Sequence, residues 1–124
     1  MSFYLLDTHI VLWWFTNNKQ LSKLIKDEIA DSENRIFVSA ATIWEISIKK
    51  SQGKLEAPDN LKEVIESEFE FLSIAADHAQ QVEFLPAIHN DPFDRILIAQ
   101  CMVEKLTLIT VDTIISRYDV PIFK

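Results

Sequence analysis

Four acidic residues stand at points of the chain where their carboxylates could act together: Asp7, Glu45, Asp94 and Asp112. Hard divalent cations such as Mg²⁺ and Mn²⁺ bind oxygen ligands, and a cluster of carboxylates supplies them. Without a cation, such a cluster repels itself. These residue types therefore favour binding of a divalent metal ion, provided that the fold brings the four acids to one place.

Each of the four acids also has an ordinary structural explanation. Asp7 could cap a helix, Asp94 could interact with the dipole of a first helical turn, and Asp112 could begin a short final turn. Glu45 precedes Lys49 by four residues, the favourable order for a surface ion pair worth ~0.2–0.5 kcal/mol. No single acid decides the matter, and the hypothesis of a metal site depends on their combination.

The elements that must position these acids alternate along the chain. Short apolar runs without polar alternation are typical of buried parallel strands. The expected strands are Phe3–Leu6, Arg35–Ser39, Phe71–Ile74, Thr107–Val111 and Val120–Phe123. The expected helices are Thr8–Phe15, Ser22–Asp31, Ala40–Ser51, Asn60–Phe69, Ala75–Leu85 and Pro92–Lys105, with a helical turn at Thr113–Arg117. This alternation predicts an α/β fold, with a mainly parallel central sheet flanked by helices.

The expected sheet can bring the acids to one edge, because sites in such sheets form beyond the carboxyl ends of the strands. Asp7 and Asp112 follow two expected strands, and Asp94 lies in the first turn of the helix that Asp91 caps. Glu45 lies just outside the apolar arc of its helix. That arc comprises Ala40, Ala41, Ile43, Trp44, Ile46 and Ile48.

Other residues carry weaker signals. The three histidines lack the mutual spacing of a metal site, and we expect His78 and His89 on the surface. His9 is expected to be structural or to face a substrate, and Cys101 to lie in the core. The run 10–15 contains only apolar residues, so a helix there would have no polar face. We therefore expect part of that helix to bind another protein.

Composition limits the class of protein. A chain of 124 residues suits one domain, expected over residues 1–124. A net charge of −7 argues against a broad basic surface for nucleic acid, so a polyanionic substrate would need a local cation. The apolar runs are far shorter than the ~20 residues of a membrane span, and we do not expect the first residues to act as a secretion signal. With a single cysteine, which allows no intrachain disulfide, these features lead us to expect a cytoplasmic protein.

Four segments carry a resemblance to a known family. They are Leu5-Leu6-Asp7-Thr8-His9, Ala40-Ala41-Thr42-Ile43-Trp44-Glu45-Ile46, Asp91-Pro92-Phe93-Asp94-Arg95-Ile96-Leu97-Ile98-Ala99-Gln100 and Leu108-Ile109-Thr110-Val111-Asp112. In this order they resemble the PIN-domain nucleases, and within that family the VapC-type toxins of bacterial toxin–antitoxin pairs. The resemblance covers essentially the whole chain, and the segment from Asp91 to Gln100 is its most specific part.

The resemblance implies that Asp7, Glu45 and Asp94 bind metal, with Asp112 as a fourth acid that could act through water. It further implies a Mg²⁺- or Mn²⁺-dependent ribonuclease that hydrolyses RNA phosphodiester bonds. A site built only from oxygen donors makes zinc the less suitable ion. The implied protein partner is a cognate antitoxin, and we expect the chain to form a homodimer.

Four further residues are candidates for contacts with the substrate. They are Thr8, Lys49, Arg95 and Thr110. The two basic side chains could bind flanking phosphates, and the two threonines could bind either phosphate or the neighbouring acids.

Two other functions compete with this hypothesis. A phosphoryl-transfer enzyme of the haloacid-dehalogenase type also opens with a strand followed by aspartate, but it usually carries a second aspartate two residues later, where this chain has His9. The other candidate is a non-catalytic protein-binding module on a PIN-like scaffold, which would not cleave RNA.

Overall fold

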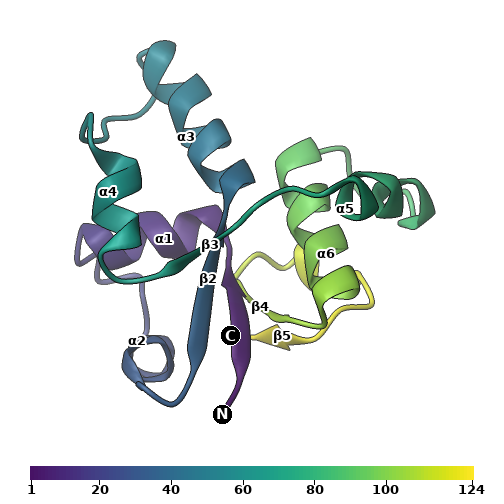
Figure 1. The fold of residues 1–124 in the computed structure, drawn as a ribbon, viewed down its shortest axis with the longest axis horizontal. Helices are drawn as coiled ribbons and strands as arrows, with labels where there is room; N and C mark the ends of the chain where they lie inside the picture. Colours follow the sequence, from purple (N-terminus) through teal and green to yellow (C-terminus); the bar gives the residue numbers. More distant parts are fainter.

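The centre of the molecule is a five-stranded sheet in which all neighbouring strands are parallel (Figure 1). The computed structural model describes residues 1–124. The strands are β1 (Phe3–Leu6), β2 (Arg35–Ser39), β3 (Glu70–Leu72), β4 (Thr107–Ile109) and β5 (Ile122–Phe123). They follow one another across the sheet in the order β3-β2-β1-β4-β5, which places β1 in the middle. The predicted α/β fold with a parallel central sheet is confirmed.

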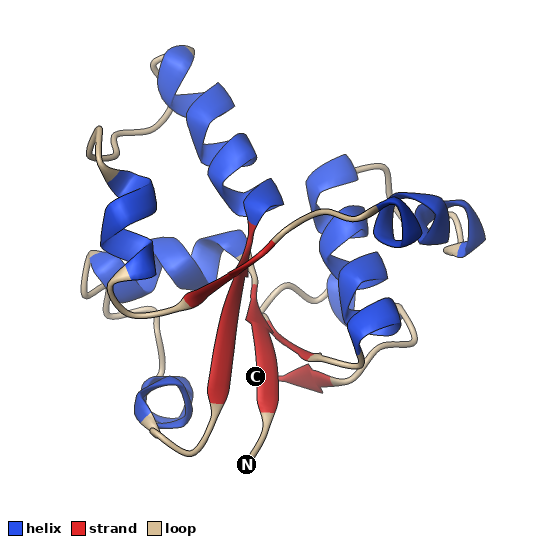
Figure 2. Ribbon diagram, viewed as in Figure 1, coloured by secondary structure: helices blue, strands red, loops and turns tan.

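Six α-helices surround the sheet (Figure 2). They are α1 (Thr8–Phe15), α2 (Lys23–Ala30), α3 (Ala40–Ser51), α4 (Leu61–Glu66), α5 (Ala76–Gln81) and α6 (Pro92–Glu104). Two short 3₁₀ helices, η1 (Val82–Phe84) and η2 (Ile115–Arg117), follow α5 and β4. None of the helices combines the length and apolar character needed to cross a membrane.

The two faces of the sheet carry separate cores, because successive side chains of a strand point to opposite faces. Tyr4 and Leu6 of β1 belong to one core, and Leu5 between them belongs to the other. The first core takes buried residues from α1, α2 and α4: Ile10, Val11, Ile25, Ile29 and Ile65. The second takes buried residues from α6 and η2: Leu97, Ile98, Cys101 and Ile115. Cys101 thus lies in the core, as predicted.

Several element ends differ from the predicted ones. The helix expected over Asn60–Phe69 ends at Glu66, because the chain turns at residues 67–69 to enter β3. The third strand is Glu70–Leu72 rather than Phe71–Ile74, and the helix expected over Ala75–Leu85 is divided into α5 and η1. The fourth and fifth strands are also shorter than predicted. Apolar periodicity identifies these elements but does not mark where their backbone hydrogen bonds stop.

Helix α1 lies over the first core and is partly covered by its own chain. Ile10 and Val11 are fully buried, whereas Trp14 and Phe15 are half-buried. Both aromatic rings contact Phe69, with ring centroids 5.8 Å and 5.9 Å away. The chain itself therefore supplies part of the burial that the sequence led us to expect from another protein.

Helix α3 buries only part of its apolar arc: Ala41 and Ile46 are buried, but Trp44 is not. Trp44 is 57% exposed, whereas Glu45 beside it is only 5% exposed. The buried side chains of α3 are Ala41, Thr42, Glu45 and Ile46. The inward-facing carboxylate of Glu45 has a polar partner, because the Thr8 hydroxyl on α1 donates to it. The helix thus directs an acidic side chain into the molecule.

Candidate active site

Asp7 lies between β1 and α1, at the carboxyl edge of the sheet. Its backbone N–H donates to the carbonyl oxygen of Ile109, which fixes it beside the end of β4. Its Oδ1 caps α1 by accepting the Thr8 backbone N–H at 2.7 Å, and its Oδ2 accepts the Thr110 hydroxyl at 2.7 Å. The side chain is only 3% exposed, and burial raises the pKa of the Asp7 carboxyl despite these hydrogen bonds. Asp7 therefore caps α1 as expected, and its carboxyl group is also buried.

Glu45 reaches the same region from α3. The Thr8 hydroxyl donates to Oε1 at 2.8 Å, and the Lys49 ammonium donates to Oε2 at 2.8 Å. The Thr42 hydroxyl lies 3.2 Å from the Thr8 hydroxyl and completes a buried polar group. The predicted pair of Glu45 and Lys49 is thus present, but its carboxylate is buried rather than on the surface.

Asp94 stands in the first turn of α6. Asp91 caps this helix by accepting the backbone N–H groups of Phe93 and Asp94, as predicted. The Oδ2 atom of Asp94 lies 3.0 Å from Nε2 of His89. Burial raises the pKa of Asp94 to about 6 against the lowering effect of this hydrogen bond, and the charges of Asp91 and Asp7 contribute to the rise.

Asp112 follows β4 by three residues. Its backbone N–H donates to the Thr110 hydroxyl oxygen at 3.1 Å, and its Oδ1 accepts the backbone N–H of Ile114 at 2.8 Å. Thr110 therefore touches both Asp7 and Asp112. The side chain of Asp112 is half-buried.

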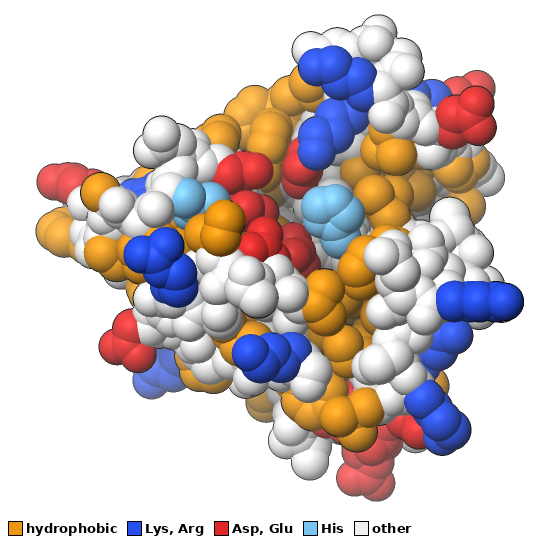
Figure 3. All heavy atoms as spheres, turned by 180° about the vertical axis from the view of Figure 1, so that it is seen from behind, with side chains coloured by type: hydrophobic (Ala, Val, Ile, Leu, Met, Phe, Trp, Pro, Cys, Tyr) orange, Lys and Arg blue, Asp and Glu red, His pale blue; other side chains and the backbone are white.

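Three of the acids influence one another electrostatically, and Lys49 links Glu45 to them. The charge of Asp112 raises the pKa of Asp7, and the charge of Asp7 raises the pKa of Asp94. The charge of Asp94 in turn raises the pKa of Lys49, whose largest perturbation is its hydrogen bond to Glu45. In Figure 3, acidic side chains gather in a hollow on the rear face, with histidine side chains on either side.

These side chains fit a hard divalent cation by the chemistry of their donors, since all four are carboxylates. In the present arrangement, however, no three His, Cys, Asp or Glu side chains lie close enough together to hold a metal ion. Thr8 and Lys49 occupy both oxygens of Glu45. A cation that bound Glu45 would therefore have to compete with Lys49 for its carboxylate.

The other candidate residues lie close to these acids, but they are not all free. Thr8 and Thr110 are buried and bind Glu45 and Asp7. Lys49 is half-buried over Glu45. The Arg95 guanidinium donates to backbone carbonyls of the segment 82–89 and to the Tyr118 hydroxyl. These contacts hold a loop in place rather than leaving Arg95 free for a phosphate.

Two histidines were placed wrongly by the sequence reasoning. His78 is only 2% exposed and binds Glu104, while His89 is half-buried between Asp94 and Tyr118. His9 is exposed, and its ring packs at an angle against Trp13 with ring centroids 6.1 Å apart. The sequence held one signal for His89, namely its position five residues before Asp94 in the loop that leads into α6.

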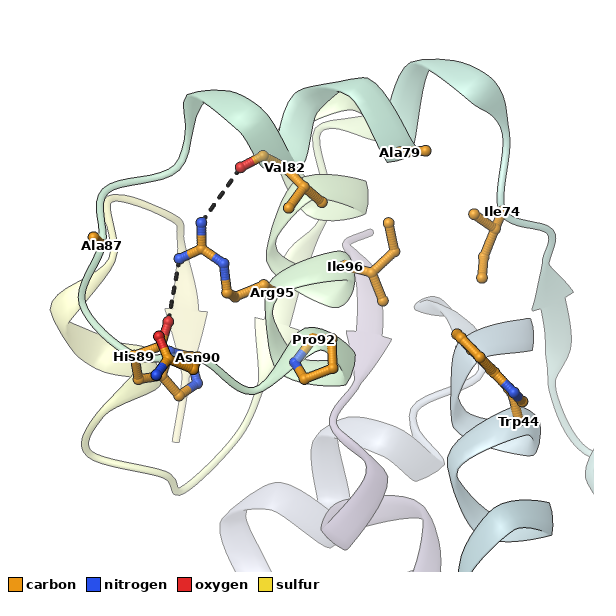
Figure 4. A pocket seen from close by; sticks show the side chains of 10 residues that line it. All are labelled: Trp44, Ile74, Ala79, Val82, Ala87, His89, Asn90, Pro92, Arg95 and Ile96. Atoms are coloured by element: carbon orange, nitrogen blue, oxygen red, sulfur yellow. Dashed lines mark hydrogen bonds between the residues drawn. The ribbon is translucent and has the colours of Figure 1, made fainter.

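A cavity of about 540 Å³ adjoins the acidic hollow (Figure 4). Trp44, Ile74 and Ile96 form apolar walls, and His89 and Arg95 lie at one end. None of the four acids lines it, so the chemistry of the carboxylates belongs to the neighbouring hollow.

Comparisons with known proteins agree with this fold. The sequence matches the model of the PIN domain over residues 4–121. It resembles the structure of VapBC2 from Rickettsia felis bound to a promoter DNA fragment, with a TM-score of 0.75, 15% identity and 98% of each chain covered. The DNA-bound VapBC of Salmonella typhimurium gives a TM-score of 0.71 at 19% identity, covering 99% of this chain and 98% of that one.

FitAcB from Neisseria gonorrhoeae is also similar, with a TM-score of 0.66, 19% identity, and 98% of this chain and 96% of that chain covered. A comparison with curated proteins found no match. Identities this low establish likeness of fold and leave the chemistry to be argued from the side chains.

Proposed function

Since this chain belongs to the PIN domain family, we propose that it is a metal-dependent endoribonuclease and the toxin of a type II toxin–antitoxin pair. One observation carries the proposal. Hydrogen bonds from Thr8 and Thr110 connect Asp7, Glu45 and Asp112 beyond the ends of β1 and β4, and the charge of Asp7 raises the pKa of Asp94 on α6. Such a concentration of partly buried carboxylates suits a divalent cation and a polyanionic substrate.

In this proposal the four acids hold one or two Mg²⁺ or Mn²⁺ ions. When bound, the metal activates water and stabilises charge on the phosphodiester. Thr8 orients the carboxylate of Glu45, and Thr110 orients that of Asp7. A carboxylate oxygen of Glu45 or Asp94 accepts the proton of the attacking water. Lys49, once released from Glu45, is placed to contact a flanking phosphate.

The test is incubation of the purified, antitoxin-free chain with total RNA, with Mg²⁺ or Mn²⁺ and with a chelator. We expect cleavage only with metal. Each cleaved bond should leave a phosphate on one product end and a hydroxyl on the other. If the RNA stays intact with every metal tested, the result would favour the non-catalytic binding module. A covalent phosphate on Asp7, trapped with a phosphate mimic, would instead favour phosphoryl transfer of the haloacid-dehalogenase type.

The proposed partners are an RNA substrate, a cognate antitoxin and a second copy of the chain, all in the cytoplasm. The similar structures include VapBC complexes, which supports an antitoxin partner. Large exposed apolar side chains support a protein interface, and Trp44 and Ile74 line the same cavity. Phe84, 68% exposed, follows Val82 of that cavity by two residues.

We therefore expect Trp44→Ser to weaken the homodimer, because it removes a large apolar side chain from this exposed surface. Light scattering over a range of concentrations measures the mass of each variant. Leu24→Ser is the matched control, since Leu24 is an exposed apolar residue on α2 away from the cavity. A Trp44→Ser protein with the same mass as the wild type at every concentration would rule out this surface as the dimer interface.

A further inference from the structure

His89 connects the candidate active site to a chain of hydrogen bonds behind it. Its Nε2 lies 3.0 Å from Oδ2 of Asp94, and its Nδ1 lies 2.7 Å from the Tyr118 hydroxyl. The Tyr118 hydroxyl also accepts a hydrogen bond from the Arg95 guanidinium at 2.9 Å. We infer that His89 is a positioning residue for Asp94, held by Arg95 and Tyr118 so that Nδ1 accepts from Tyr118 and Nε2–H donates to Asp94. The inference deepens the proposed function and rests on it.

The direction of each hydrogen bond follows from the groups involved. The Arg95 guanidinium and the His89 backbone N–H can only donate, so the Tyr118 oxygen accepts from both, at 2.9 Å and 3.3 Å. The proton of Tyr118 has one acceptor within hydrogen-bonding distance, which is Nδ1 of His89. Tyr118 is only 3% exposed, so a hydroxyl proton without an acceptor would lose its solvation uncompensated. Nδ1 must therefore accept.

This direction decides the tautomer of the imidazole. A neutral imidazole carries one proton, and with Nδ1 acting as acceptor that proton lies on Nε2. Nε2 then donates to Oδ2 of Asp94. A second proton on Nδ1 would point at an oxygen that already accepts from Arg95 and would leave the Tyr118 proton without a partner. The geometry therefore supplies Asp94 with a hydrogen-bond donor whose direction is fixed by Tyr118.

The consequence for Asp94 concerns its two oxygens. Oδ2 is held by His89, whereas Oδ1 has no hydrogen bond in the structure and remains available to a metal ion. Holding one oxygen fixes the plane of the carboxylate before a cation arrives. Hydrogen-bond partners of metal-binding carboxylates commonly act in this way, and their loss costs ~10–100-fold in metal affinity or activity.

The frame that holds His89 is itself anchored. Arg95 donates to the carbonyl oxygens of Pro86 and Val82, at 2.8 Å and 3.4 Å, and the latter contact is visible in Figure 4. The rings of His89 and Tyr118 pack edge to face, with centroids 5.4 Å apart. The assembly joins the loop before α6, α6 itself and the end of η2. Its rigidity allows a single hydrogen bond to orient Asp94.

The first experiment measures Mn²⁺ affinity by calorimetry for the full-length protein and its variants. His89→Phe keeps a ring but removes both hydrogen bonds, and we expect it to weaken Mn²⁺ binding ~10–100-fold. His89→Gln should restore most of the affinity, because its amide nitrogen can donate where Nε2 does. The matched control is His78→Gln, which alters the other buried histidine–carboxylate pair and should leave Mn²⁺ affinity unchanged.

The second experiment reads the tautomer directly, through the ¹⁵N resonances of His89 in the metal-free protein. We expect the Nε2–H tautomer in the wild type and a mixture of tautomers in Tyr118→Phe. A wild-type protein with its proton on Nδ1, or a His89→Phe protein that binds Mn²⁺ as tightly as the wild type, would overturn the inference while the proposed function stands. A wild type that binds no Mn²⁺ would overturn the proposed function, and with it the role of His89.

Discussion

Asp7→Asn should abolish RNA cleavage while leaving the fold intact. Asparagine lacks the charge that binds a cation, so the loss should exceed the ~10–100-fold cost of losing an outer hydrogen-bond partner. The fold should persist because the amide oxygen can still accept the Thr8 backbone N–H and cap α1. The Thr110 hydroxyl, which now donates to Oδ2, can rotate to accept from the new amide N–H. Glu45→Gln and Asp94→Asn should have the same effect, and Asp112→Asn a smaller one.

Cleavage of a defined RNA with Mn²⁺ measures this effect, and circular dichroism reports whether each variant is folded. Asp77→Asn is the matched control, since it makes the same change at an exposed carboxylate on α5 and should retain full activity. Near-wild-type cleavage by a folded, contaminant-free variant of Asp7, Glu45 or Asp94 would exclude that residue from the site.

Millimolar Mg²⁺ or Mn²⁺ should raise the melting temperature of the wild-type protein. A ligand present at 100 times its Kd stabilises a protein by ~2.7 kcal/mol, which for a domain of this size corresponds to a rise of roughly 5–15 °C. Asp7→Asn should melt higher than the wild type without metal and respond less to its addition. The reason is that the variant removes a buried carboxylate close to other acids.

The gain from Asp7→Asn should depend on pH in a defined direction. Because the pKa of Asp7 is raised in the folded protein, the folded state binds the extra proton and wild-type stability falls as pH rises toward that pKa. The variant's advantage is therefore full above the folded pKa and disappears in acid, where wild-type Asp7 is already neutral. Melting curves from acid to neutral pH measure this. If metal leaves the melting temperatures of both the wild type and Asp7→Asn unchanged, the result would argue that the four acids do not share a metal site.

Much of the site could be predicted from the sequence because its acids stand at element ends. Asp7 follows a strand and Asp91–Pro92 marks the start of a helix, so both Asp7 and Asp94 could be placed beside a sheet edge before the structure was known. Strand ends and helix starts are local features, and the topology of a parallel sheet brings them together.

The orientation of α3 could not be predicted in this way. Periodicity places Trp44 in the apolar arc and Glu45 just outside it, but the structure exposes Trp44 and buries Glu45. The deciding contact is the hydrogen bond from Thr8, a residue on another helix and 37 positions away. Burial of a polar side chain depends on such a partner, and a hydrophobic arc contains no information about it.

The role of His89 was missed for the same reason. Its partners Asp94 and Tyr118 lie on α6 and after η2, and no spacing rule connects a loop histidine to a buried tyrosine 29 residues later. The apolar run of α1 likewise gave no sign of its contact with Phe69, which partly covers its aromatic side chains. In each case the missing information is a contact between elements that are distant in the sequence.

The hydrogen bond from Thr110 to Asp7 joins residues 103 positions apart, so Asp7 is synthesised long before its partner. On the ribosome, Asp7 leaves the exit tunnel long before Thr110 and Asp112 are made, and β4 has not yet paired with β1. At ~5–20 residues per second, several seconds of translation separate the two ends of this bond. A nascent chain therefore carries scattered carboxylates with no common site, and any activity that depends on their union begins only after translation.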